Sequence, residues 1–245
     1  MISASPADTP TPAKSPGRIG LILEMGLMVA VLVGTKLIFD QIVWKYAGPI
    51  SLAITLGLLA IITARRGESW SAFGLRRLKR WWSWPLVLPQ GLLCMVGILA
   101  AGAGTAFAGD ALGLWSIAEG EAGVEARFGD IVGNLPVYLG WLALAWTSAA
   151  FGEEIFFRGY VIDRLTRILP SAKWASILAV VISALGFGLV HMYYQGLRGL
   201  IATGLIGLAL GLLYLGYKRN IWPLILAHGA VDTLSFTAFY LDLDI

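Results

Sequence analysis

Apolar stretches long enough to cross a lipid bilayer follow one another along most of this chain. Of its 245 residues, 58% are hydrophobic and 13% are charged, whereas a typical soluble domain has about 25% charged residues. A span needs about 20 apolar residues, because a helix rises about 1.5 Å per residue across about 30 Å of hydrocarbon. We find seven such stretches and therefore expect an all-α, polytopic transmembrane helical bundle. They cover roughly 19–43, 48–64, 84–108, 132–157, 174–193, 198–217 and 221–240.

The charges between these stretches predict how the bundle sits in the membrane. With the amino terminus inside, most of the 18 Lys and Arg residues fall in inner connections, and the outer connections are mainly acidic. This asymmetry fits the positive-inside rule and predicts the amino terminus inside and the carboxyl terminus outside. The basic residues assigned to the inner side are Lys14, Arg18, Arg65, Arg66, Arg76, Arg77, Lys79, Arg80, Arg158, Arg164, Arg167, Lys173, Lys218 and Arg219.

The chain is expected to form one intramembrane domain behind a short tail. Residues 1–18 are rich in Pro, Ser, Thr and Ala and have no apolar core, so we expect a disordered cytoplasmic tail rather than a signal peptide. Residues 19–245 leave almost no room for a soluble domain and are expected to form a single unit. The single cysteine, Cys94, lies in an apolar stretch and can form no intrachain disulfide.

Two further features concern the surface and the packing of the bundle. The connection 65–84 combines basic residues with several Trp residues, and we interpret it as an interfacial helix beside anionic headgroups. A nucleic-acid site would need this patch on a soluble face, so we expect no nucleic-acid partner. Gly207 and Gly211 form a G-x-x-x-G pattern, which predicts close helix packing.

Three short patterns place polar side chains in the fourth, fifth and seventh stretches. A charged residue at the centre of a membrane helix costs about 2.5 to 3.5 kcal/mol on insertion scales, so such residues mark functional sites. We therefore predict a polar active-site cavity among these three spans. The patterns are Glu153-Glu154-Ile-Phe-Phe-Arg158, Phe187-Gly-Leu-Val-His191 and His228-Gly-Ala-Val-Asp232.

The two adjacent glutamates have different predicted roles. Glu154 and Arg158 are four residues apart, so on a helix they can pair, with Arg158 reaching the inner interface. Glu153 points about 100° away around the helix and has no local cation. We therefore predict that Glu153 is the general base and takes a proton from water. Glu154 and Arg158 are expected to orient it, and the alternative is that both glutamates only close a packing network.

The two histidines complete the predicted catalytic set. His191 on its own could be a core histidine bonded to a backbone carbonyl. Asp232, four residues after His228, can hold the tautomer and the orientation of that imidazole. Because so many polar groups are costly in apolar spans without a task, we predict that Glu153, His191, His228 and Asp232 act together.

The predicted depths of these residues do not agree with one another. Glu153 lies near the inner end of a fourth stretch that ends at 157. His191 follows Trp174 by some 17 residues, or about 25 Å at about 1.5 Å per residue. A shared site therefore requires that the fifth helix begins well out in the cytosol, or that spans four and five are tilted or broken.

The three patterns resemble those of a known family. E-E-x-x-x-R, F-x-x-x-H and H-x-x-x-[N or D], in this order, are similar to the motifs of the CPBP (CAAX protease and bacteriocin-processing, Abi) intramembrane proteases, which include the type II CAAX prenyl endopeptidases. The likeness covers about residues 130–240. It implies an endopeptidase in which Glu153 activates water with help from His191, while His228 and Asp232 stabilise the oxyanion. An ionised Asp232 would repel an oxyanion, so orienting His228, carrying a proton and binding a metal stay open as its role.

Metal dependence divides the possible mechanisms. The four predicted catalytic residues would make an acceptable zinc set, since catalytic zinc commonly has three protein ligands of these types. The H-E-x-x-H pattern of helical zinc proteases is absent from the sequence. We therefore favour a metal-free, glutamate-driven hydrolysis without a cofactor, and zinc is the alternative.

The expected substrates are membrane-associated or lipid-anchored peptides. The protein is expected to be integral to a bacterial inner membrane, with its active site opening toward the cytoplasm. A non-catalytic membrane immunity or scaffold protein of the same fold is the alternative. A proton-coupled transporter is less favoured, because no two-half repeat with broken helices is evident.

Overall fold

The described part of the structure contains helices and no strand. It is a computed structural model that describes residues 16–77, 84–118, 122–170 and 173–243. Two long helices contain a non-helical residue, namely α1 (Arg18–Arg65) at Val43 and α6 (Ala175–Gly216) at Gly196. The other elements are η1 (Trp70–Phe73), α2 (Trp84–Ala111), α3 (Ala122–Phe128), η3 (Gly129–Ile131), α4 (Leu135–Leu144), η4 (Ala145–Val161), α5 (Ile162–Ile168) and α7 (Trp222–Tyr240).

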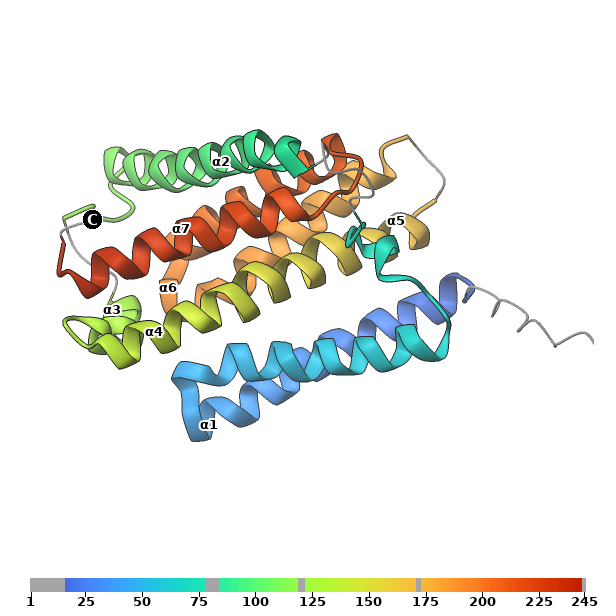
Figure 1. Ribbon diagram of the computed structural model, residues 1–245, viewed down its shortest axis with the longest axis horizontal. Helices are drawn as coiled ribbons and strands as arrows, with labels where there is room; N and C mark the ends of the chain where they lie inside the picture. Colours follow the sequence, from blue (N-terminus) through green and yellow to red (C-terminus); the bar gives the residue numbers. More distant parts are fainter. Residues whose placement is uncertain (1–15, 78–83, 119–121, 171–172, 244–245) are drawn as a thin grey trace, which may run out of the picture.

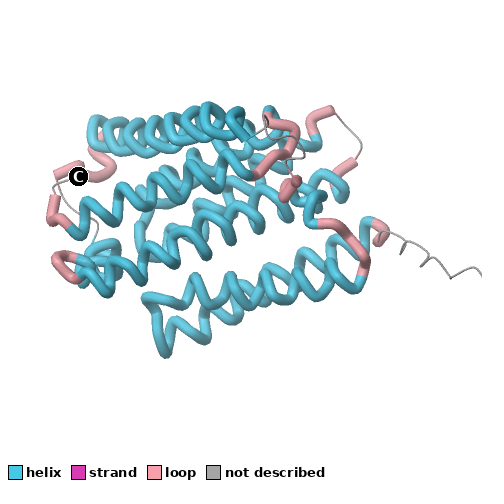
Figure 2. The backbone as a smooth tube through the Cα atoms, in the orientation of Figure 1, coloured by secondary structure: helices cyan, strands magenta, loops and turns pink. Residues whose placement is uncertain are grey.

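The helices form a bundle whose connections gather at its two ends. In Figure 1, α1 doubles back as a hairpin along one side, α2 runs along the opposite side, and α4 and α7 lie between them. Figure 2 shows the loops at the ends of this bundle. Helices α6 and α7 pack on α2, and η4 packs on α1, α6 and α7. The element η4 therefore lies at the centre of the packing.

The described residues include four helices that are long and apolar enough to cross a membrane. Two of the four are the bent helices, whose arms correspond to the first and second and to the fifth and sixth predicted stretches. The chain is a helical membrane protein, as predicted. The count of seven spans and the orientation stay predictions. The four helices are Arg18–Arg65, Pro85–Ala111, Leu135–Ile168 and Ala175–Gly216.

The α6 hairpin depends on glycines. Gly196 has a φ of +58°, a conformation that residues with a Cβ rarely adopt. A Cβ placed at Gly207 would lie 3.1 Å from Cα of Ala184, and one at Gly211 would lie 2.6 Å from Cγ1 of Val180. The two arms therefore touch where only glycine fits. The close packing predicted from G-x-x-x-G is confirmed, and its partner is the other arm of α6.

The helix that contains the fourth predicted stretch is longer than the sequence predicts. The predicted stretch ends at 157, whereas α4, η4 and α5 continue from Leu135 to Ile168. Arg158 and Arg164, which were assigned to an inner connection, are 1% and 0% exposed. Hydropathy does not indicate this burial, because it scores each charge alone, whereas the cost of burying a charge depends on its partners. The assignment of both residues to the inner side stays a prediction.

Arg164 is held by carboxylates from three parts of the chain. Its Nε donates to Oε1 of Glu24 at 3.0 Å, its Nη2 to Oε2 of Glu68 at 2.6 Å, and its Nη1 to Oδ2 of Asp163 at 2.9 Å. Arg66 also pairs with Glu24. A desolvated ion is tolerated only when it is paired. This network therefore fixes α5 against α1 and the connection that follows α1.

Parts of two predictions lie outside the described residues, namely residues 1–15 of the predicted tail and residues 78–83 of the predicted interfacial segment. In the described part of that segment, η1 is a short 3₁₀-helix that buries Phe73 fully, rather than a longer interfacial helix. Contact with anionic headgroups stays a prediction. The division into a tail and one domain over 19–245 also stays a prediction.

Replacement of Arg164 by Met is expected to lower the free energy of unfolding by about 3 kcal/mol or more, because buried carboxylates lose their cation. Thermal unfolding in detergent measures this loss. Arg167→Met is the matched control: its side chain is 33% exposed and lies 3.4 Å from Asp163, so the expected loss is below about 1 kcal/mol. Equal losses for the two variants would contradict the importance of this network.

Candidate active site

The predicted site begins on a π-helix rather than an α-helix. Element η4 carries both glutamates and is π-helical throughout. π-Helical turns use i→i+5 hydrogen bonds, are rare, and occur frequently at functional sites. Glu154 is fully buried, whereas Glu153 is partly exposed and lines a cavity. The two glutamates thus have different surroundings, as expected, although the α-helical geometry behind that expectation is wrong.

Glu154 is the centre of the polar contacts. Its Oε1 accepts a hydrogen bond of 2.9 Å from Nη1 of Arg158 and another of 2.9 Å from Nδ1 of His228. Arg158 lies over the ring of Phe187, 4.3 Å from its centroid. The expected pairing of Glu154 with Arg158 is present. The guanidinium of Arg158 is buried within the protein, and its expected reach to the inner interface stays a prediction.

His228 is oriented by Glu154 more closely than by Asp232. An ionised carboxylate only accepts hydrogen bonds, so the contact with Glu154 places a proton on Nδ1 of His228. The other ring nitrogen, Nε2, lies 3.7 Å from Oδ2 of Asp232, which is beyond hydrogen-bond distance. The spacing in the sequence predicts only the Asp232 contact, because Glu154 is 74 residues from His228.

His191 lies on α6 just before the bend of that helix. Its Nδ1 donates to the backbone oxygen of Phe187 at 2.8 Å, which leaves Nε2 of the neutral ring as an acceptor. The ring centroid lies 4.6 Å from that of Phe187 and 6.1 Å from that of Tyr194. The backbone bond is the one expected of a core histidine, but His191 also lines the cavity.

One cavity of about 410 Å³ brings the predicted catalytic residues together. The conflict between their predicted depths disappears because the fourth span runs on to Ile168, so Glu153 is near the middle of that span rather than at its end. Neither a cytosolic start of the fifth helix nor a tilt or break in spans four and five is needed to explain the shared cavity. Their catalytic roles stay predictions. The predicted catalytic residues in the cavity wall are Glu153, His191, His228 and Asp232.

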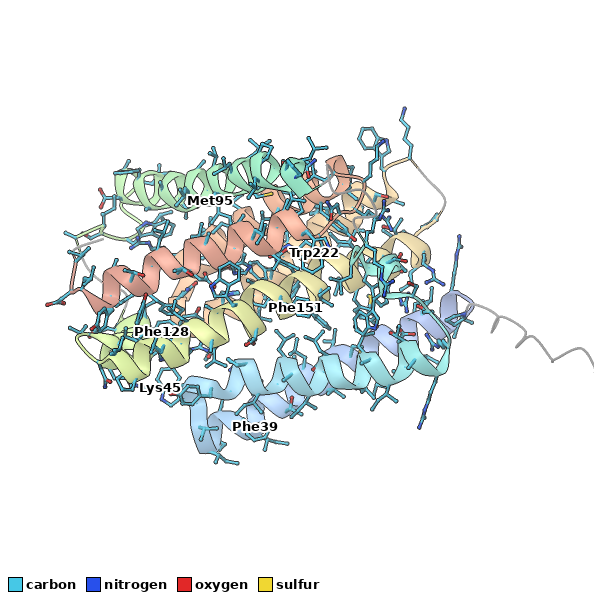
Figure 3. The ribbon with its side chains drawn as sticks, viewed as in Figure 1. Phe39, Lys45, Met95, Phe128, Phe151 and Trp222 are labelled. Atoms are coloured by element: carbon cyan, nitrogen blue, oxygen red, sulfur yellow. The ribbon has the colours of Figure 1, made fainter. Side chains whose placement is uncertain are left out.

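The cavity lies toward the end of the bundle that holds α3 and the bends of α1 and α6. Its wall there includes Gly48, Arg127 and Tyr194, and Figure 3 labels Lys45 and Phe128 at this end. The basic connections lie at the opposite end, where α5 ends and α7 begins (Figure 1). If the amino terminus is inside, this end of the bundle is the outer one, which argues against a cytoplasmic opening. The orientation and the side on which the cavity opens both stay predictions.

The sequence did not indicate Arg127 as a cavity residue, since its position predicts an outer connection. Arg127 is only 6% exposed and lines the cavity. Its Nε donates to the backbone oxygen of Lys45 at 3.1 Å, and its Nη1 donates to Oη of Tyr193 at 3.0 Å. These partners are 82 and 66 residues away along the chain. No local spacing could have indicated them.

The donor atoms of the site are a poor match to a zinc ion. In the described residues, no group of three or more His, Cys, Asp or Glu side chains is placed to hold a metal. The Nδ1 atoms of His191 and His228 and Oε1 of Glu154 are already hydrogen-bonded. Catalytic zinc commonly needs three protein ligands in tetrahedral geometry. Zinc dependence stays the alternative to a metal-free reaction.

Comparison with known proteins gives one match. Residues 135–234 match the family model described as type II CAAX prenyl endopeptidase Rce1-like. The matched segment extends from α4 into α7 and contains Glu153, His191 and His228 with their neighbours. No curated protein and no solved structure matches the chain. The resemblance inferred from the three patterns is confirmed.

Gly229 is expected to be required for the approach of α7 to η4, because a Cβ there would lie 2.6 Å from Cε3 of Trp146. Gly229→Ala should lower the free energy of unfolding by about 1–3 kcal/mol, the usual cost of overpacking. Gly140→Ala is the matched control, since a Cβ at that position meets nothing within 4 Å. Thermal unfolding of both variants tests this, and an unchanged Gly229→Ala protein would argue against close packing here.

Proposed function

On the premise that residues 135–234 of this membrane protein match the Rce1-like family of type II CAAX prenyl endopeptidases, we propose that the chain is an intramembrane endopeptidase with a glutamate-activated water. The observation that carries the proposal is the single cavity that Glu153, His191 and His228 share. A general base, an imidazole acceptor and a second imidazole around one space are a sufficient set for amide hydrolysis.

Glu153 is the proposed general base because it is the free member of the glutamate pair. Glu154 already accepts hydrogen bonds from Arg158 and His228, whereas Glu153 has no hydrogen bond or ion pair within the described residues. In the proposed reaction, Glu153 takes a proton from water as the water oxygen attacks the scissile carbonyl carbon. The same proton then passes to the leaving nitrogen as the C–N bond breaks.

The other residues hold the reacting groups in place. Nε2 of His191 accepts from the attacking water, because Nδ1 is committed to the carbonyl of Phe187. His228 lies between the carboxylates of Glu154 and Asp232 and acts as an imidazolium, which donates from Nδ1 to Glu154 and from Nε2 to the developing oxyanion. Asp232, 3.7 Å from that nitrogen, orients His228. Glu154 and Arg158 are positioning residues behind the cavity wall.

The proposed substrates are membrane-associated or lipid-anchored peptides. The cavity lies within a membrane bundle and is lined largely by apolar and aromatic side chains, which suits an extended, apolar segment. The reaction uses side chains alone, in line with the donor arrangement described above. A bacterial inner membrane is the proposed location.

Replacement of Glu153 by Gln is expected to reduce kcat for a panel of lipidated peptides by about 10²–10⁴-fold, because general-base catalysis contributes this much. Cleavage by purified protein, followed by mass spectrometry, measures the rate. Glu125→Gln, an isosteric change at an exposed carboxylate outside the cavity, should retain the wild-type rate. A zinc chelator should leave the wild-type rate unchanged.

Two outcomes would count against this assignment. Full activity of Glu153→Gln would exclude Glu153 as the base. Background cleavage by every variant, wild type included, would instead favour the immunity or scaffold alternative.

The side on which the cavity opens can be measured by labelling intact cells with a membrane-impermeant maleimide. Single cysteines in a Cys94→Ala background are placed at Arg76 in a basic connection and at Asp242 beyond α7. The charge asymmetry predicts that Asp242→Cys is labelled and that Arg76→Cys is protected until the cells are permeabilised. The reverse pattern would place the cavity toward the cytoplasm and the basic connections outside.

A further inference from the structure

Arg127 is a buried cation held by aromatic rings. Its guanidinium carbon lies 4.6 Å from the ring centroid of Tyr194, 5.2 Å from that of Phe128 and 5.7 Å from that of Trp141. Its two hydrogen bonds, to Lys45 and Tyr193, go to a backbone carbonyl and a neutral hydroxyl. These contacts hold the guanidinium in one orientation, and none of them neutralises its charge.

The absence of a carboxylate separates Arg127 from the other buried arginines. Within the described residues, Arg158 and Arg164 each have a carboxylate partner, and Lys36, which lines the same cavity, pairs with Asp40. Arg127 has no carboxylate partner among these residues, although it is only 6% exposed. A desolvated charge without a counter-ion is costly. A ligand that supplies a negative charge would remove this cost.

Arg127 faces the same cavity as the proposed catalytic residues. Tyr194 is a neighbour of both Arg127 and His191, with 4.6 Å from the Arg127 guanidinium to the Tyr194 ring and 6.1 Å from that ring to the ring of His191. The separation of Arg127 from His191 therefore cannot exceed the sum of these two distances. At roughly 3.3–3.6 Å per residue, about three residues of extended peptide cover that separation.

We propose that the Arg127 end of the cavity is an anion-binding subsite, in which the guanidinium holds a carboxylate of the bound peptide within about three residues of the scissile bond. A guanidinium has five donors in a planar fork, which suits bidentate binding of a carboxylate. Two of these donors are used by Lys45 and Tyr193. The carboxylate can belong to the carboxyl terminus of the peptide or to an acidic side chain. This inference rests on the proposed function for its scissile bond, but the binding step can be measured without cleavage.

The test uses the full-length protein in nanodiscs with Glu153→Gln, so that no probe is cleaved. The probe is a palmitoylated, fluorescent hexapeptide of alanine and leucine, made as a free acid, as a carboxyl-terminal amide, and as that amide with one internal aspartate. The free acid or the aspartate peptide should bind about 10- to 100-fold more tightly than the plain amide, as expected for hydrogen bonds to a charged group. The tighter of the two identifies the source of the carboxylate.

Arg127→Gln should abolish this preference and leave binding of the plain amide unchanged, and Arg127→Lys should restore part of it. Lys45→Gln is the matched control, because it removes a nearby cation whose side chain pairs with Asp130 at 3.0 Å and does not line the cavity. Equal binding of acid and amide by the Arg127-containing protein, or no binding of the acid forms at millimolar concentration, would overturn the subsite. Unchanged amide binding by Arg127→Gln shows that the variant is folded.

The proposed function and the subsite can fail separately. Charge-dependent binding without any cleavage by the wild-type protein would contradict the proposed protease activity and support the subsite. Cleavage without a preference for acidic probes would support the protease activity and contradict the subsite.

Discussion

The need to neutralise one buried carboxylate, Glu154, determines how the rest of the site is arranged. Lipid supplies no water to a charged group, so a buried charge is costly unless a partner lies within the protein. Glu154 finds one partner on its own helix, Arg158, and the other on α7, His228. The first contact fixes the carboxylate and the second fixes the imidazole. Glu153, one residue earlier, lines the cavity and has no such partner among the described residues, because Arg158 and His228 both contact Glu154.

Hydropathy predicts most of the helices of this fold but not where each helix ends. The arms of α1 and α6 correspond to predicted stretches, because a run of apolar residues has no other stable environment than the bilayer. Hydropathy ends the fourth stretch at 157, but the helix continues through Arg158 and Arg164, and both arginines are buried and paired. The pairing partners, such as Glu24, lie far away in the sequence, and no window of hydropathy includes them.

Some contacts of the candidate site can also be predicted from local sequence spacing, whereas others depend on residues far apart in the chain. The pairing of Glu154 with Arg158 follows from a spacing of four residues, even though η4 is π-helical and the expected geometry was α-helical. The hydrogen bond from His228 to Glu154 and the position of Arg127 in the cavity depend on how separate helices pack. Nothing in the spacing of these residues carries that information. The local patterns therefore indicate which residues line the cavity, and only the packing of the helices shows which of them contact one another.

The pairing of Glu24 has a consequence for the order in which the protein is made. Its partner Arg164 is synthesised 140 residues later, so the first arm of α1 must enter the bilayer before that arginine exists. Arg66 follows Glu24 by 42 residues at the end of the second arm and also pairs with it. The α1 hairpin can therefore insert during translation with the charge of Glu24 balanced by Arg66. The Glu24 carboxylate is then already in place to bind Arg164 when α5 is synthesised.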